Sequence, residues 1–412
     1  MTTMSNTDIE PISVIELTRD PANRSDPYPL YERIRAMGRV VPTMFGGGVI
    51  TSHADCFAVL RDNRFSSSNR HQAGYEDFRT MAEQLGIGDL FSMMDRVMLF
   101  ADPPDHTRLR RLVSKAFTPK AIEEMRARIQ RIVDDCLDRA AAKGGMEIVE
   151  DLAFPLPVTV ISEMLGVPTE DNQQLREWTA QAVKLLDPSD DVAELLPASG
   201  HVVAMRDYFD GLVASRRKEL GDDLLSALIA VEDDGESLTH DELLDTMILL
   251  FGAGHETTVN LISGGMLNLF RHPDQLQRLR DDPSLIGNAV EELLRFGPPV
   301  QFSGRTATTD VTFGDVTFEK GQQLIVLIAA ANRDPDVFDD PQTLDIGRQD
   351  NRHLAFGGGI HLCLGAPLAR VEGQEAILRL VQRFPDLRLV DEEVEWKPTT
   401  TIRGPARLDL TW

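Results

Sequence analysis

Helical periodicity runs through most of the 412 residues, and no other feature of the sequence limits the possible fold as strongly. Apolar residues recur at i, i+3, i+4 and i+7 over long stretches, which is the pattern of amphipathic helices, whereas strand-like runs are few and short. The sequence therefore predicts a mainly α fold with small β-sheets. The predicted helices cover 106–143, 156–165, 204–219, 241–270, 274–281, 285–296 and 366–383, and the predicted strands lie in 39–51 (a hairpin), 311–318 and 323–328.

Nothing in the sequence indicates a division into domains or a targeting segment. No repeat or Gly/Ser-rich linker interrupts it, so we expect one domain over residues 1–412. The first 17 residues lack the basic-then-apolar order of a signal peptide, and no apolar run approaches the roughly 18–20 residues of a membrane span. The three cysteines, Cys56, Cys136 and Cys363, are odd in number and widely spaced, which argues against a disulfide framework. We expect a cytoplasmic monomer without membrane association.

The net charge is strongly negative but unevenly distributed. With 42 Lys and Arg against 66 Asp and Glu, the formal charge is 42 − 66 = −24, which argues against nucleic acid as a partner. Residues 106–131 nevertheless hold eight basic and two acidic residues, or +6, so the rest of the chain carries −24 − 6 = −30. Such a run is usually a solvated helix face. It is also what a docking surface for an acidic partner requires.

The segment 353–370, HLAFGGGIHLCLGAPLAR, carries the most chemical information. Cys363 lies in a glycine-rich loop just before an amphipathic helix, where backbone N–H groups and the helix dipole stabilise a thiolate. A lone cysteine is more often a small buried hydrophobic residue. The glycine run is no dinucleotide-binding loop, because Leu362 stands where that fingerprint needs its third glycine.

The helical stretch 241–270 contains residues that are unusual in a helix interior. Gly252 and Gly254 each cost about 1 kcal/mol relative to alanine there. Glu256 and Thr257 place an acid and a hydroxyl within an apolar run, and a threonine can bond to the i−4 carbonyl and bend the helix. One interpretation is a close helix crossing with Glu256 facing solvent. A zinc-protease motif is excluded, since HETTV lacks the second histidine of HExxH.

Two motifs indicate a family. The spacing F-G-x-G-x-H-x-C-x-G, from Phe356 to Gly365, resembles the heme-binding loop of the cytochrome P-450 family, and AGHETT around Glu256 and Thr257 is similar to the oxygen-binding helix of that family. Further segments, 26–38, 156–168 and 331–338, extend the resemblance over nearly the whole chain. It implies a helix-rich, triangular prism-shaped fold around a buried heme b, with O₂ as co-substrate.

The resemblance also implies roles for individual residues. Cys363 would be the axial thiolate ligand of the heme iron, which favours O–O bond cleavage. Glu256 and Thr257 would be the catalytic pair that supplies protons for that cleavage. Four further residues would pair with the heme propionates: His106, Arg110, Arg305 and His361. The other implied cofactor contacts are Phe356, Gly359, Gly365 and Ala253.

The implied activity is monooxygenation of a bulky apolar small molecule such as a macrolide, terpenoid, steroid or fatty acid. Electrons would come from NAD(P)H through a ferredoxin reductase and a ferredoxin. A peroxide-driven enzyme and a heme sensor or carrier without turnover are the alternatives. The 65–100, 180–200 and 397–402 segments would surround the pocket, lined also by Leu249, Val300 and Gln301. Candidates for docking of the ferredoxin are Arg108, Arg111 and Lys115.

One segment departs from the family pattern. Glu292 and Arg295 stand at i, i+3, as in the Glu-x-x-Arg structural pair of the family. The family closes this network with a third basic residue, but Thr343 occupies that position here. Arg348 is the candidate substitute.

Overall fold

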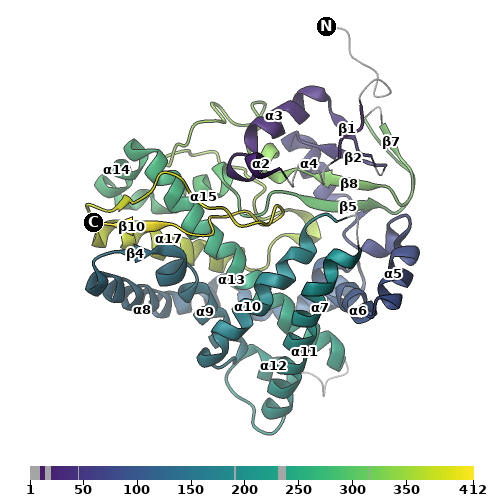
Figure 1. Cartoon of the computed structure of the whole chain (residues 1–412), viewed down its shortest axis with the longest axis horizontal. Coiled ribbons are helices and arrows are strands. Elements are labelled where there is room, and N and C mark those ends of the chain that lie inside the picture. Colours follow the sequence, from purple (N-terminus) through teal and green to yellow (C-terminus); the bar gives the residue numbers. More distant parts are fainter. Residues whose placement is uncertain (1–9, 14–19, 45, 190–191, 231–237, 315) are drawn as a thin grey trace.

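The longest helix, α13 (His240–Arg271), runs through the middle of the molecule in the computed structural model (Figure 1). The structure describes residues 10–13, 20–44, 46–189, 192–230, 238–314 and 316–412. A capping box starts α13: the Thr239 hydroxyl accepts a hydrogen bond from the Glu242 N–H, and the Glu242 carboxylate accepts one from the Thr239 N–H. The molecule tapers toward α11 and α12, which gives the triangular outline that the resemblance implied.

The helices around α13 confirm a mainly α fold. Those that precede it are α2 (Pro21–Ser25), α3 (Tyr28–Met37), α4 (His53–Arg61), α5 (Tyr75–Gln84), α6 (Gly88–Arg96), α7 (Asp105–Val113), α8 (Pro119–Lys143), α9 (Pro155–Leu165), α10 (Asn172–Ala182), α11 (Leu196–Arg216) and α12 (Leu224–Ala230). Those that follow it are α14 (Pro273–Asp281), α15 (Ile286–Phe296), α16 (Ile328–Ala331) and α17 (Ala366–Arg383).

The prediction of one helix over 106–143 is wrong. Helix α7 ends at Val113, and α8 begins at Pro119 after a short 3-10 turn. Proline lacks the N–H that would continue a helix but fits its first turn, and the Thr118 hydroxyl caps α8 by accepting a hydrogen bond from the Ala121 N–H (3.3 Å).

Three small sheets, counted over the residues that the structure describes, complete the fold. The largest has the order β1 (Val40–Pro42), β2 (Gly48–Ile50), β8 (Gln323–Val326), β5 (Ser303–Ala307) and β3 (Phe65–Ser66), in which only β2 and β8 are parallel, with Gly48 opposite Leu324. The hairpin predicted in 39–51 is therefore confirmed. The other two sheets pair β4 (Met146–Glu147), β10 (Asp409–Thr411) and β9 (Arg388–Leu389), and β6 (Val311–Phe313) with β7 (Val316–Phe318).

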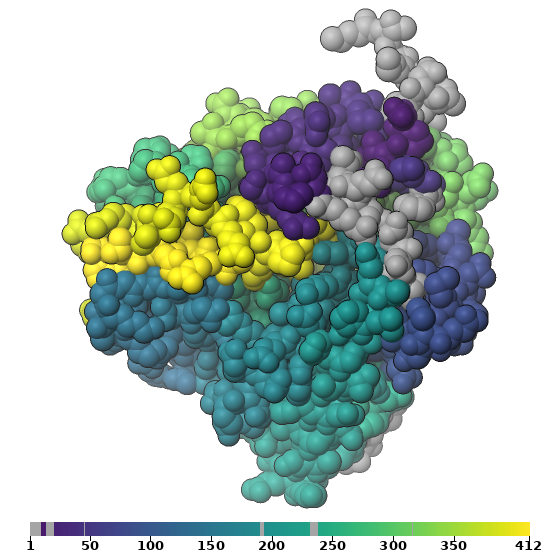
Figure 2. Space-filling model, in the orientation of Figure 1, coloured from purple at the N-terminus to yellow at the C-terminus, as the bar shows by residue number. Residues whose placement is uncertain are grey.

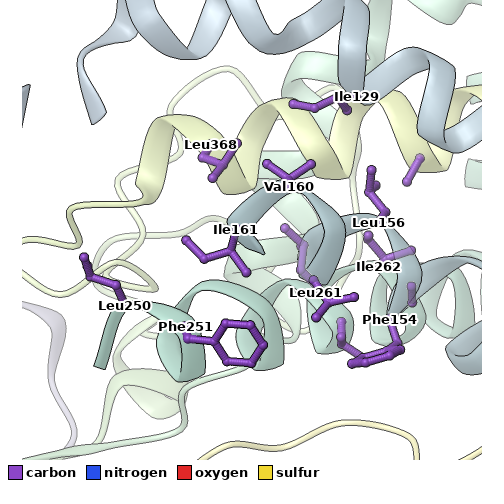
Figure 3. Packing of buried hydrophobic residues seen from close by; sticks show 14 of the residues in the cluster. Ile129, Phe154, Leu156, Val160, Ile161, Leu250, Phe251, Leu261, Ile262 and Leu368 are labelled. Atoms are coloured by element: carbon purple, nitrogen blue, oxygen red, sulfur yellow. The ribbon is translucent and has the colours of Figure 1, made fainter. Parts of the chain in front are cut away.

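The main core lies where α8, α9, α13 and α17 meet (Figure 3). Val160 and Ile161 of α9 point between α17 and α13. Gly254 of α13 makes room for this crossing, since a Cβ there would lie 3.0 Å from Ile161 Cγ1. No helix in the described ranges is long and apolar enough to cross a membrane.

Candidate functional site

The loop that carries Cys363 runs from β8 and α16 toward α17 and depends on two glycines with left-handed backbone. Gly357 has φ +71° and Gly359 has φ +65°, a region that glycine enters without steric cost. A Cβ on Gly359 would lie 2.3 Å from Leu60 O of α4. The Cys363 N–H then donates to Phe356 O (2.9 Å), which closes the loop below the sulfur.

Cys363 differs from the other two cysteines in being accessible, since Cys56 and Cys136 are buried. The protein around Cys363 still displaces most of its water, and this desolvation raises the pKa of the thiol. The backbone N–H groups of Gly365 and Ala366 and the charge of Arg110 oppose that rise. The N–H groups of the loop and helix therefore act in the expected direction, but desolvation of the sulfur outweighs them. A metal ion at the sulfur supplies the positive charge that ionisation of this thiol needs.

Four basic side chains come together beside the loop: His106 and Arg110 from α7, Arg305 from β5 and His361 from the 3-10 turn Gly359–His361. The two imidazole rings lie 4.4 Å apart between centroids. The Nε2 atoms of both histidines are buried and have no hydrogen-bond partner. Arg110 donates to the backbone oxygen of the loop at Leu362 (2.7 Å). The structure thus brings together the four residues that the resemblance implies as propionate partners, and that role stays a prediction.

The burial and positive charge of this cluster favour binding of an anion. Burial, followed by Arg305, His106 and Arg110, lowers the pKa of His361 to about 3. Burial lowers the pKa of Arg305 to about 10, and only Asp102 acts against it. Two unsatisfied imidazole nitrogens next to two guanidinium groups fit a ligand that bears carboxylates, as the heme propionates do. With the accessible thiol, the residues present fit heme.

Phe356 of the loop lies between two residues that the sequence motifs did not single out. The ring of His353 is 5.8 Å from the ring of Phe356, and the Arg370 guanidinium lies 4.5 Å from its centroid. His353 and Arg370 both bind Glu291, at 3.2 Å and 2.6 Å. Although desolvation opposes them, these two partners lower the pKa of Glu291 to about 2. His353 and Arg370 flank the cysteine motif in sequence, and this proximity is the signal that could have identified them as residues of the site.

On α13 the residues Leu249, Ala253 and Thr257 follow one another at intervals of four and so share a face. Ala253 is exposed, although most of α13 is buried. The Thr257 hydroxyl donates to Ala253 O (3.0 Å), the i−4 bond expected of a threonine in a helix. Gly252 and Gly254 instead face α10 and α9, so the close helix crossing is also present.

Glu256 does not face solvent, because Lys397 holds it. Lys397 Nζ lies 2.5 Å from Glu256 Oε1, and the Glu256 side chain is only 13% exposed. Desolvation would raise the pKa of Glu256, but Lys397 outweighs it, with help from His255, and the pKa is lowered. Lys397 begins the 397–402 segment that was expected near the pocket, but no motif pairs it with Glu256, from which 141 residues separate it.

Some of the residues predicted to line the pocket or the docking surface contact other residues of this chain instead. Gln301 is fully buried, its amide bound to Tyr31 (3.0 Å) and to Pro298 O (2.6 Å), so the expectation that it lines the pocket is wrong. Val300 is half-buried and forms a β-bridge with Ile402. Arg108 is paired with Glu242 at the start of α13, whereas Arg111 and Lys115 are exposed.

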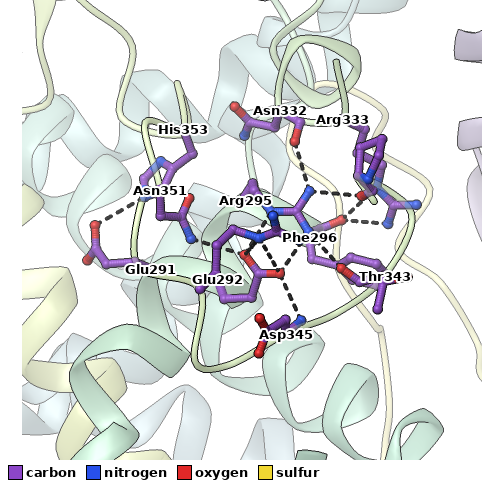
Figure 4. Close-up of polar contacts among 12 residues, drawn as sticks. Glu291, Glu292, Arg295, Phe296, Asn332, Arg333, Thr343, Asp345, Asn351 and His353 are labelled. Atoms are coloured by element: carbon purple, nitrogen blue, oxygen red, sulfur yellow. Dashed lines mark hydrogen bonds and ion pairs between the residues drawn. The ribbon is translucent and has the colours of Figure 1, made fainter. Parts of the chain in front are cut away.

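The Glu292–Arg295 pair is fully buried and its network is complete (Figure 4). Arg295 donates to both Glu292 oxygens, at 2.7 and 2.8 Å, and to Thr343 O (3.0 Å), so Thr343 contributes only its backbone. Arg348 Nε lies 3.2 Å from Glu292, and Asn351 donates to Glu292 at 3.0 Å. The candidate substitution of Arg348 for the missing third basic residue is confirmed.

The comparisons with known proteins agree with this geometry. The family profile described as Cytochrome P450 matches residues 71–406. Cytochrome P450 CYP107DY1 of Priestia megaterium is 44% identical over 348 residues, 84% of each chain, and the vitamin D(3) 25-hydroxylase of Pseudonocardia autotrophica is 40% identical over 393 residues, 94% of each. The crystal structure of myxobacterial cytochrome P450 CYP267B1 in complex with myristic acid matches with a TM-score of 0.89 and 40% identity, over 97% of this chain and 99% of that one. The chain therefore belongs to the cytochrome P450 family, monooxygenases that bind heme b and use O₂ as co-substrate.

Proposed function

We propose that this monooxygenase hydroxylates or epoxidises a bulky apolar small molecule of the macrolide, terpenoid, steroid or fatty-acid type. The observation that carries this proposal is the face of α13 with Leu249, Ala253 and Thr257, which is apolar, accessible at Ala253 within a largely buried helix, and ends on a hydroxyl. Apolar walls with few polar groups are typical of sites for apolar ligands. The relatives named for vitamin D(3) and crystallised with myristic acid support the same class.

In this proposal Cys363 ligates the iron, and His106, Arg110, Arg305 and His361 bind the heme propionates. The thiolate-ligated heme supplies activation of O₂ and cleavage of the O–O bond, for which two electrons and two protons are needed. The unsatisfied Nε2 atoms of the two histidines then gain acceptors. Phe356 and Gly359 hold the loop in this proposal, which is supported by the hydrogen bond from Cys363 N–H to Phe356 O and by the left-handed backbone of Gly359.

Thr257 and Glu256 take part in proton transfer in the proposed reaction. Because the Thr257 hydroxyl donates its hydrogen to Ala253 O, its lone pairs are left to accept a hydrogen bond from water or substrate on the accessible face. Glu256 is ionised in its pair with Lys397, so it takes up a proton before it donates one.

Substitution of Thr257 tests this role. Thr257→Ala should lower product formed per NAD(P)H consumed and release peroxide, while Thr257→Ser, which keeps the hydroxyl, should retain most of the coupling. An unchanged product yield in Thr257→Ala would contradict the assignment. Cys363 is tested separately by the absorption spectrum of the reduced carbon monoxide complex, in which a band at the histidine-ligated position would contradict thiolate ligation.

The substrate class is tested by titrating the heme-loaded protein with steroids, terpenoids, macrolides and fatty acids and following the heme absorption. Micromolar binding by at least one of these classes is expected. Binding only of small polar compounds would contradict the proposal.

Electrons are proposed to come from NAD(P)H through a ferredoxin reductase and a ferredoxin that docks at Arg111 and Lys115. Both are exposed, and ferredoxins are acidic partners for such a basic surface. Lys115→Glu should slow ferredoxin-dependent reduction and weaken its dependence on salt, whereas Lys320→Glu in the exposed turn before β8 should not. Equal effects of the two variants would contradict docking at this surface.

A further inference from the structure

The hairpin loop 397–402 contacts two separate parts of the molecule. These are Glu256 on α13 and Asp187 at the end of the 3-10 helix η7 (Val183–Leu186). The loop belongs to the C-terminal segment, which lies on the surface between the N-terminal helices and the helices of the lower half (yellow in Figure 2). Lys397 N donates to Gly404 O (3.1 Å) and the Thr399 hydroxyl to Ile402 O (2.7 Å), so the loop is internally bonded. Gln301 N donates to Thr401 O (2.9 Å), which ties it to the segment after α15.

One end of the loop is bound by Asp187. This residue ends the 3-10 helix η7 (Val183–Leu186), which continues α10 into the connection toward α11. Its carboxylate accepts hydrogen bonds from Thr401 N–H (2.7 Å), Thr400 N–H (3.1 Å) and the Thr400 hydroxyl (3.1 Å). The Thr401 hydroxyl donates to Leu186 O (2.8 Å). Three bonds from neutral donors to one charged acceptor make this a strong local contact.

The other end of the loop carries Lys397, which pairs with Glu256. Lys397 and Thr400 are three residues apart, so their Cα atoms are separated by at most about 11 Å. Pro398 lies between them and further stiffens this span. The internal hydrogen bonds of the loop and Pro398 limit how far Thr400 moves relative to Lys397, so we expect a shift at the Asp187 contact to reach Lys397.

We propose that Asp187 and Lys397 are positioning residues for Glu256, and that the loop couples the contact made by Asp187 to the state of that acid. While Asp187 binds Thr400 and Thr401, Lys397 is held against Glu256. When Asp187 releases Thr400 and Thr401, Lys397 is no longer fixed and Glu256 loses the charge that keeps it ionised. This inference rests on the proposed role of Glu256 as the proton-transferring acid.

The other groups that act on Glu256 do not belong to the loop. They are His255 beside it on α13 and Arg176 of α10, which is itself paired with Glu150 (2.5 Å). Among the described residues, no hydrogen bond or ion pair joins either of them to Asp187 or Thr400, so we expect a change at Asp187 to reach Glu256 through Lys397.

The experiment compares Asp187→Asn with Asp210→Asn in the heme-loaded protein. Asp210 also accepts a hydrogen bond from a neighbour, His240, but lies on α11 away from the loop. Two quantities are measured: hydrogen exchange at the Thr400 and Thr401 amides, and the pH midpoint of the Glu256 carboxyl band in infrared spectra, with Glu256→Gln as the blank. Thr400→Ala, which removes only one hydrogen bond, is a milder second variant.

Asp187→Asn should speed exchange at both amides by about tenfold or more, because it removes a charged acceptor. It should also raise the pH midpoint of Glu256, as Lys397→Met should and Lys397→Arg should not. Asp210→Asn should change neither, and Thr400→Ala should shift both quantities in the same direction by less. Exchange that is unchanged in Asp187→Asn and Thr400→Ala would refute the contact, and faster exchange with an unchanged midpoint would refute the coupling. If Glu256→Gln leaves product per NAD(P)H unchanged, the proposed role of Glu256 fails, independently of these two measurements.

Discussion

Replacing Arg348 by alanine tests whether this residue supplies the positive charge that Thr343 does not. Arg348 Nε lies 3.2 Å from Glu292, and its Nη1 donates to Asp339 O (2.9 Å). Glu292 is fully buried, so water does not replace the lost contact. In contrast, Thr343 contributes only its backbone oxygen, to Arg295.

The cost is worked out from these contacts. A hydrogen bond to a charged group contributes about 1.5–3 kcal/mol, and a second one to a backbone oxygen about 1 kcal/mol. Glu292 keeps Arg295 and Asn351, so the loss stays below the full ~3–5 kcal/mol of a broken buried pair. We expect Arg348→Ala to lower the free energy of unfolding by about 3 kcal/mol. With about 2.1 cal/mol/K of unfolding entropy per residue, this corresponds to a fall in Tm of about 3 °C for the 412 residues.

The measurement is denaturant unfolding of the heme-loaded protein, followed by circular dichroism, for Arg348→Ala, Arg348→Lys and Thr343→Ala. Thr343→Ala should change the free energy of unfolding by less than about 0.5 kcal/mol, as expected for a side chain that makes no contact in the network. Arg348→Lys should fall between the two, because lysine keeps the charge but not the paired N–H geometry. Equal losses in Arg348→Ala and Thr343→Ala would refute the reasoning.

Three further predictions concern other sites. Glu291→Gln should lower stability near neutral pH and lose this effect in acid: the folded-state pKa of Glu291 is lowered to about 2, so its contribution is present above the unfolded value of 4.5 and disappears as the pH falls toward 2, which pH-dependent denaturation measures. Gly359→Ala should destabilise the protein and reduce heme content, because its Cβ would meet a backbone oxygen at 2.3 Å, whereas Gly365→Ala, which meets nothing within 4 Å, should leave the stability of the heme-free chain nearly unchanged. Gln301→Ala should lower the melting temperature without changing ligand affinity, because Gln301 is hydrogen-bonded to Tyr31 and has no accessible surface. A change in ligand affinity without a change in melting temperature would contradict this.

The long helices could be predicted because their apolar stripes are continuous over three or more turns. The strands β4, β9 and β10 could not, since each has only two or three residues and shows no period of its own. β10 pairs with β4 across more than 250 residues of sequence, and neither strand reveals its partner. The break at Pro119 was readable from proline chemistry but was hidden by the apolar pattern that continues on both sides.

The candidate site shows the same division. Cys363, the glycines of its loop, and the Glu256–Thr257 pair could be proposed from the sequence, because they stand in two local motifs that resemble those of the family. Arg348 could be named as a candidate but not decided, since its distance to Glu292 depends on how the loop after α16 folds back. Gln301 was assigned to the pocket from its position in the family pattern, and the sequence does not show that its side chain is buried against Tyr31.

The sequence by itself determined the helical class, and two local motifs singled out the loop of Cys363 and the Glu256–Thr257 pair, because the residues of each motif lie a few positions apart. Only the tertiary structure decided the charge environment of these groups: Lys397 against Glu256, His353 and Arg370 against Glu291, and two unsatisfied histidines beside two arginines. The physical reason is that burial and charge pairing act through space over a few ångströms, while the residues that supply them are separated by as many as 141 positions along the chain.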